Sequence, residues 1–176
     1  MLSLTATALS LTFPALVLFA AAKDATSFRI PNWISLTLAA LFPAAGFVVG
    51  LPPQVMALNA GVGALVLAGG MALFALRWLG GGDAKLFAAA ALWLGWPALI
   101  DFGLAAALMG GVLALILLTL RSPGARPLVL LGPGWVTRLA EPGQGVPYGV
   151  AIAAGALAAF PQTPFATGPL SHLGGL

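Results

Sequence analysis

Long apolar segments, separated by short breaks rich in proline, glycine or charge, are the feature that most limits how this chain can fold. A helix that crosses the hydrocarbon core of a bilayer needs roughly 20 mostly apolar residues. The alternating polarity of a membrane-spanning strand is absent. The sequence therefore predicts an all-α membrane protein, a bundle of about six transmembrane helices. The predicted helices are Leu2–Ala22, Trp33–Leu51, Val55–Leu76, Ala84–Ile100, Phe102–Leu120 and Val146–Phe160.

The scarcity of charge supports the same conclusion. Charged residues make up 6% of the chain, whereas a soluble domain carries about 25%. Such a chain cannot cover its surface with polar groups, so its partner must be the lipid bilayer. The length suits a single transmembrane domain over residues 1–176. The net charge of +3 comes from scattered Lys and Arg rather than a basic run, so we expect no nucleic-acid partner. The sequence does not indicate an oligomeric state.

The positions of the basic residues predict an orientation. With six crossings, every Lys and Arg falls on one side of the membrane. The positive-inside rule makes that side cytoplasmic. We therefore expect both termini outside and the long connection at about 121–145 in the cytoplasm. The basic residues are Lys23, Arg29, Arg77, Lys85, Arg121, Arg126 and Arg138.

Several kinds of site are excluded by composition. The chain has no Cys, which rules out disulfides, thiolate zinc sites and cysteine nucleophiles. Its single His, His172, lies near the C-terminus, so a histidine-based metalloprotease site is not available. We expect neither a metal nor another cofactor.

Two aspartates stand out because a charge in a bilayer protein is costly and marks a functional site by default. Asp24 ends the first apolar segment, and Asp83 follows Gly80, Gly81 and Gly82 at the start of the fourth. Both fall on the predicted cytoplasmic side. Two close carboxyl groups can act together as base and acid on a water molecule and an amide. The glycines would let an extended substrate backbone approach Asp83. The sequence therefore predicts a cytoplasmic-face active site, and leaves open which aspartate is acid and which is base.

Two other readings compete with catalysis. Each aspartate could be a solvated loop residue beside Lys23 or Lys85. Alternatively, a small transporter or a pilus-assembly scaffold could use Asp24 and Asp83 as a proton relay. Transporter sites usually lie near the bilayer midplane, and these aspartates are predicted near one face, which favours the enzyme.

Three stretches, taken in order, give the chain a family resemblance. They are Asp24 with Ile30-Pro31-Asn32, Gly80-Gly81-Gly82-Asp83-Ala84-Lys85, and Pro147-Tyr148-Gly149. Together they resemble the prepilin peptidases, intramembrane aspartic proteases with a Gly-x-Gly-Asp signature. The small size is similar to the tight-adherence, or Flp pilus, branch of that family.

The resemblance implies an aspartic endopeptidase of the bacterial inner membrane with Asp24 and Asp83 as catalytic residues. Its substrate would be a prepilin, cut at the cytoplasmic face after a glycine just ahead of the hydrophobic helix. Larger members carry an extra cytoplasmic domain with paired cysteines and also methylate the new N-terminus. This chain has neither that domain nor any Cys, so we do not expect methyltransferase activity.

Four further residues are candidates for supporting the site. Lys85 would either stabilise the Asp83 carboxylate or an oxyanion, or serve as a positive-inside anchor. Asn32 is expected to hydrogen-bond near Asp24, and Pro31 to shape the start of the second helix. Tyr148 is either an interfacial aromatic or a hydroxyl donor near the site. The tryptophans at 78, 93, 96 and 135 are expected in interfacial belts.

Overall fold

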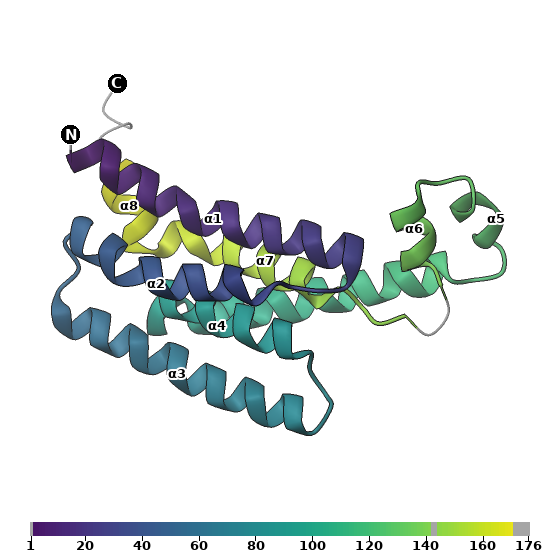
Figure 1. Ribbon diagram of the computed structural model, residues 1–176, viewed down its shortest axis with the longest axis horizontal. Helices are drawn as coiled ribbons and strands as arrows, with labels where there is room; N and C mark the ends of the chain where they lie inside the picture. Colours follow the sequence, from purple (N-terminus) through teal and green to yellow (C-terminus); the bar gives the residue numbers. More distant parts are fainter. Residues whose placement is uncertain (1, 142–143, 171–176) are drawn as a thin grey trace.

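The computed structural model describes residues 2–141 and 144–170, and these residues form helices joined by short connections, with no strand. His172 lies outside the described residues. Figure 1 shows the long helices side by side, with α5 and α6 standing apart at one end. The elements are α1 (Leu2–Ser27), α2 (Asn32–Val48), α3 (Pro53–Ala75), α4 (Gly81–Leu120), α5 (Arg126–Val129), α6 (Gly134–Leu139), α7 (Tyr148–Ala159), the 3-10 helix η1 (Phe160–Gln162) and α8 (Pro164–Leu170).

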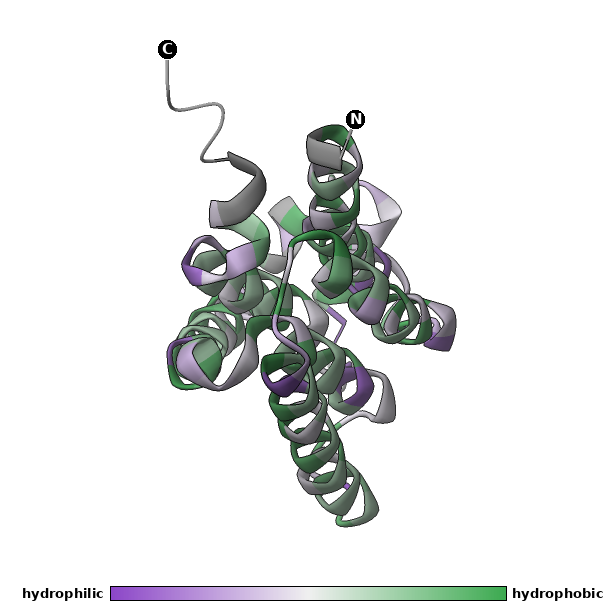
Figure 2. Ribbon diagram, turned by 90° about the vertical axis from the view of Figure 1, so that its left-hand side faces the viewer, coloured by the Kyte–Doolittle hydropathy of each residue, from purple (hydrophilic) through white to green (hydrophobic). Residues whose placement is uncertain are grey.

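The helices have the length and composition of membrane spans. Among the described residues, Leu4–Ser27, Pro53–Ala75 and Gly81–Leu120 are long and apolar enough to cross a bilayer, while Asn32–Val48 and Tyr148–Gln162 are apolar but shorter. Figure 2 shows apolar residues on all sides of most helices. A helix that is apolar all round must be surrounded by protein or lipid. The chain is therefore an all-helical membrane protein.

The longest helix, α4, folds back on itself at Gly95. The 40 residues of α4 would measure roughly 60 Å as a straight helix, about twice the hydrocarbon core. Gly95 instead has φ 71° and ψ −178°, a conformation essentially restricted to glycine. Phe87 before the turn and Phe102 after it stack their rings with centroids 4.2 Å apart, although a continuous helix would separate these residues by roughly 22 Å. The turn predicted within Gly95–Asp101 thus occurs at Gly95.

Small residues let the neighbouring helices approach the two halves of α4 closely. A Cβ placed on Gly70 of α3 would lie 3.0 Å from the Cβ of Ala84 in the first half of α4. A Cβ on Gly155 of α7 would lie 2.6 Å from the backbone nitrogen of Ala106 in the second half. Close contact between small residues is the usual basis of helix association in lipid. These contacts place α3 against the first half of α4 and α7 against the second half.

An aromatic cluster forms the centre of the bundle, and it includes a tryptophan expected at the membrane interface. Trp93 is fully buried, and its Nε1–H donates to the carbonyl oxygen of Leu38 at 2.8 Å. Phe13 and Phe165 pack on its ring, with centroids 5.5 Å and 4.8 Å away. The interfacial prediction for Trp93 was wrong because the bundle supplies the partner that a buried indole N–H requires.

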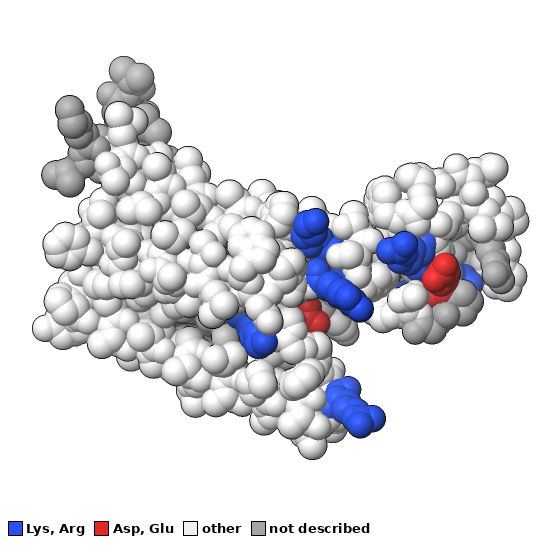
Figure 3. Space-filling model, viewed as in Figure 1, with Lys and Arg blue, Asp and Glu red and all other residues white. Residues whose placement is uncertain are grey.

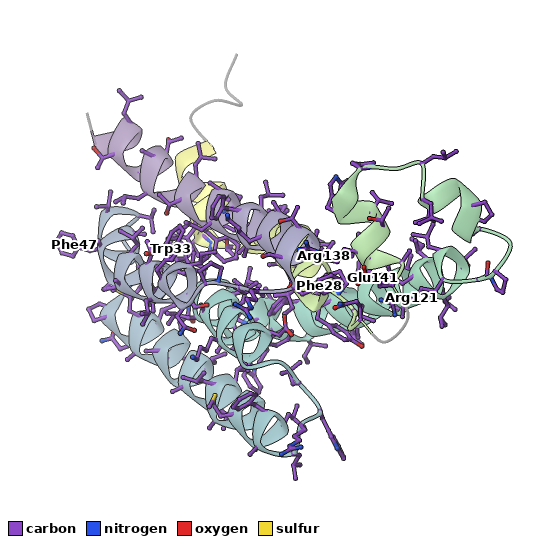
Figure 4. The ribbon with its side chains drawn as sticks, turned by 45° about the vertical axis from the view of Figure 1, so that its right-hand side comes forward. Phe28, Trp33, Phe47, Arg121, Arg138 and Glu141 are labelled. Carbon is purple, nitrogen blue, oxygen red and sulfur yellow. The ribbon has the colours of Figure 1, made fainter. Side chains whose placement is uncertain are left out.

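The connection at 121–145 is more ordered than a simple hydrophilic loop. Arg121, at the end of α4, donates from Nε to the carbonyl oxygen of Leu139 at 3.1 Å and from Nη2 to that of Gly145 at 2.9 Å. Figure 4 shows Arg121 near Arg138 and Glu141 of the α6 region. These bonds tie the two ends of the connection together. Leu131, between α5 and α6, is 84% exposed.

Two helix boundaries differ from the prediction in ways that matter for the aspartates. α1 continues past Ala22 to Ser27, so Asp24 lies inside the last turns of the helix rather than at its end. α4 begins at Gly81, so Gly81 and Gly82 belong to its first turn rather than to a flexible loop. Both aspartates are therefore held by helical backbone.

The Gly95 turn leads to a stability prediction. Alanine would be strained at this φ by about 1–3 kcal/mol, and its Cβ would lie 2.5 Å from Oδ1 of Asn59. Gly95→Ala is therefore expected to lower the thermal unfolding temperature in detergent. The control is Gly111→Ala, which also lies in α4 but where a Cβ meets nothing within 4 Å. Equal stability of the two variants would contradict the tight turn at Gly95.

Candidate active site

Asp24 and Asp83 line one pocket, although they come from distant parts of the sequence. The pocket has a volume of about 480 Å³ and is bounded by the end of α1, the segment Phe28–Asn32 and Gly80–Gly82. The structure thus brings together the two residues that the sequence singled out, along with Pro31, Asn32 and the three glycines.

Asp24 is held by the N-terminus of α7. Its side chain is only 5% exposed, and the backbone N–H of Gly149 donates to Oδ2 at 2.7 Å. The first amides of a helix have no acceptor within the helix, so this bond satisfies a free donor and a buried acceptor at once. A Cβ on Gly149 would lie 2.9 Å from Oδ2 of Asp24 and 2.8 Å from Cδ1 of Ile30. Gly149 is therefore a site residue. The sequence identified it only as part of the Pro147-Tyr148-Gly149 motif and did not predict its contact with Asp24.

Asp83 is the third residue of α4 and is half-buried. Its Oδ2 folds back over Gly80, where an added Cβ would lie 2.5 Å away. A Cβ on Gly81 would meet the ring of Phe74 at 3.2 Å, and one on Gly82 would meet Cβ of Ile30 at 3.2 Å. Each of the three glycines thus has a close neighbour within the protein that a side chain would crowd, in addition to the predicted role of leaving room for substrate.

The segment between α1 and α2 forms one wall of the pocket. α1 ends at Ser27, and the next residue, Phe28, has a left-handed φ of 52°. The N–H of Phe28 donates to the carbonyl oxygen of Asp24 at 2.8 Å. A positive φ is rare for a bulky residue, and here it turns the chain so that Phe28 and Arg29 line the pocket. Pro31 then directly precedes α2 as its N-cap residue.

Lys85 and Asn32 contact each other rather than the aspartates. Nζ of Lys85 donates to Oδ1 of Asn32 at 3.0 Å. Asn32 lines the aspartate pocket, but Lys85 does not. The reason is the start of α4 at Gly81: residues two apart on a helix face nearly opposite directions, so Lys85 points away from the side chain of Asp83. Any support that Lys85 gives the site would act through Asn32.

Tyr148 lines a different cavity from Asp24, and Asp83 lines both of these cavities. Tyr148 is the first residue of α7 and is 44% exposed. An added Cβ on Gly110 would lie 3.1 Å from Cε1 of its ring. Tyr148 and Asp83 both line a second, mostly apolar cavity of about 340 Å³ between α3, the two halves of α4 and α7. The position is compatible with either predicted role.

Basic side chains surround this end of the molecule. Figure 3 shows Lys and Arg over the middle and right-hand part of the visible face, with acidic side chains among them, and none toward the left-hand end. Arg29 is part of the pocket lining itself. The aspartate pocket therefore lies at the basic end of the bundle.

Together, the fold and the site define a helical membrane protein in which two carboxyl groups, held by helix ends, share a pocket beside a glycine run. The chain belongs to the type IV leader peptidase family, whose model matches residues 11–115, more than half of its length. It is therefore a peptidase, and both aspartates fall within the matched region. The comparison with curated proteins and the comparison with solved structures give no match.

The contact between Gly149 and Asp24 leads to a prediction for activity. The methyl group of Gly149→Ala would occupy the space of the Asp24 carboxyl group and weaken their hydrogen bond. We expect peptidase activity to fall at least about tenfold, since a small misplacement of a reacting group can cost two orders of magnitude.

The matched control is Gly145→Ala, which lies in the preceding connection, where a Cβ meets nothing within 4 Å. Cleavage is followed by gel mobility of a prepilin, at equal amounts of each variant in the membrane. Full activity of Gly149→Ala would contradict a functional contact between the last long helix and Asp24.

Proposed function

We propose that this protein is an aspartic endopeptidase that removes the leader peptide of a prepilin of the Flp, or tight-adherence, type at the cytoplasmic face of the bacterial inner membrane. The observation that carries the proposal is the shared pocket: Asp24 and Asp83 are 59 residues apart in sequence and line the same cavity. Membership of the leader peptidase family supplies the reaction class.

The chemistry requires the two carboxyl groups to act as a pair. One takes a proton from a water molecule held between them, so that the water oxygen attacks the scissile carbonyl carbon. The other gives its proton to the carbonyl oxygen. When the tetrahedral intermediate collapses, the first carboxyl group passes the proton it took from water to the leaving amine, and the second recovers a proton from a hydroxyl group of the intermediate as the carbonyl re-forms. Two carboxyl groups that share one proton are suited to both tasks. The roles of Asp24 and Asp83 within the pair are not assigned.

The position of the pocket supports cleavage at a membrane face rather than within the bilayer. It lies where α1 ends and where α2 and α4 begin, at the end of the bundle that carries the basic residues. A leader peptide with its cut site just ahead of a hydrophobic helix would bring its scissile bond to this depth. A proton relay at the midplane has no such support.

We further propose a six-span topology. Because α4 folds back at Gly95, its two halves count as two crossings, and α1, α2, α3 and α7 supply the others. Both termini would then lie outside. The absence of Cys, and with it of the paired cysteines of larger relatives, argues against an additional N-methyltransferase activity.

Replacing either aspartate tests the catalytic pair. Asp24→Asn and Asp83→Asn are each expected to abolish processing of a co-expressed prepilin, because neither amide can take up or share the proton. The matched control is Asp101→Asn, an exposed aspartate of α4 beyond the Gly95 turn, which should process normally. Processing that survives in either pocket variant would refute the catalytic pair.

The absence of Cys also makes the topology testable by single-cysteine labelling. Cysteines at Ser27, after Asp24, and at Trp78, before the glycine run, are expected to react with a membrane-impermeant maleimide only from the cytoplasmic side. A cysteine at Gln54, in the connection between α2 and α3, should react from outside. Labelling of Ser27 and Trp78 from opposite sides would eliminate a shared active site.

A further inference from the structure

A wide groove lies on the far side of α4 from Tyr148. Its volume is about 620 Å³, and α2, α3 and the first half of α4 line it. Its body is apolar and built largely from alanines such as Ala39, Ala60 and Ala64. The aspartates do not line it, so neither the active site nor the proposed chemistry accounts for it.

Polar groups occur at the end of this groove that faces the basic side of the protein. Lys85 and Asn32 line this end and are joined by the 3.0 Å hydrogen bond. That bond leaves further N–H donors of the Lys85 ammonium group free. The groove thus has a cation at its mouth and hydrocarbon along its length.

A third polar group lies deeper and lacks a partner. Ser35 is 7% exposed, lines the groove, and its Oγ makes no hydrogen bond to any described residue. A buried hydroxyl without a partner is costly and calls for an explanation. Ser35 follows Asn32 by three residues, so it lies roughly 4.5 Å further along α2. The donors are therefore staggered by depth: an ammonium group first, a hydroxyl group below it.

We propose that this groove is a binding site for an anionic glycerophospholipid. The lipid phosphate would accept from Lys85, a glycerol ester carbonyl would accept from Ser35, and an acyl chain would lie along the alanines. Glycerophospholipids carry these groups in this order of depth, and cationic pockets between helices are known to suit anionic headgroups. A substrate helix fits less well, because its backbone carbonyls are already hydrogen-bonded within the helix.

Purified protein in detergent tests the site with phosphatidylglycerol and phosphatidylcholine of identical acyl chains. Phosphatidylglycerol is expected to raise the thermal unfolding temperature of the wild type more than phosphatidylcholine does, since a ligand that binds the folded state stabilises it. Native mass spectrometry should show one phosphatidylglycerol retained per chain. Lys85→Gln should remove the preference between the two lipids, and Ser35→Ala should reduce retention several-fold.

Filling the groove provides the matched comparison. Ala64→Leu should abolish lipid retention, whereas Ala72→Leu, an exposed alanine of α3 outside the groove, should behave as wild type. Equal stabilisation of the wild type by both lipids would overturn the proposal, and so would undiminished retention in Ala64→Leu. If Ala64→Leu blocks prepilin cleavage while phosphatidylglycerol remains bound, the groove belongs to the substrate and the lipid proposal fails. Lipid binding is measured without substrate, so its outcome is independent of the proposed peptidase activity.

Discussion

The bond between the Gly149 amide and the Asp24 carboxyl group is the contact on which the site depends. In a chain this apolar, a buried carboxyl group has few places to find a donor, and the first amides of a helix have few places to find an acceptor. The N–H of Gly149 donates to Oδ2 of Asp24 at 2.7 Å, so the donor and the acceptor each gain the partner they lack. They are 125 residues apart, so the bond also fixes the last long helix against the first and closes the bundle at its basic end.

Close packing of backbone extends this arrangement to Asp83. Ile30 lies between the two helix starts: its Cβ is near Gly82 of α4 and its Cδ1 is near Gly149 of α7. A side chain on either glycine would push Ile30 away and separate the helices. The position of Asp83 relative to Asp24 is thus set by contacts between glycine backbone and one isoleucine, and not by any direct bond between the two acids.

Hydropathy and charge predicted the helical membrane fold and placed both aspartates at the same end, because each depends on local sequence alone. Contacts between distant segments were beyond the reach of that reasoning. In the sequence, Trp93 cannot be distinguished from a tryptophan at the membrane interface. Its burial follows from a contact between distant segments, in which its N–H donates to the carbonyl oxygen of Leu38. Gly149 was visible as part of a motif, but nothing in one sequence shows that its amide meets Asp24. The pairing of Lys85 with Asn32 was missed for a simpler reason, a misplaced helix boundary.

The start of α4 at Gly81 explains why Asp83 and Lys85, only two residues apart, line different cavities. If Gly80–Asp83 formed a loop, Asp83 and Lys85 could both turn toward the pocket. Because α4 begins at Gly81, helical geometry sends them to opposite faces: Asp83 to the carboxylate pocket and the cavity of Tyr148, Lys85 to the apolar groove with Ser35. A lysine beside the acids would form an ion pair with them and compete with a water molecule. Two residues further along the helix, Lys85 bonds Asn32 instead and does not line the pocket of the two acids.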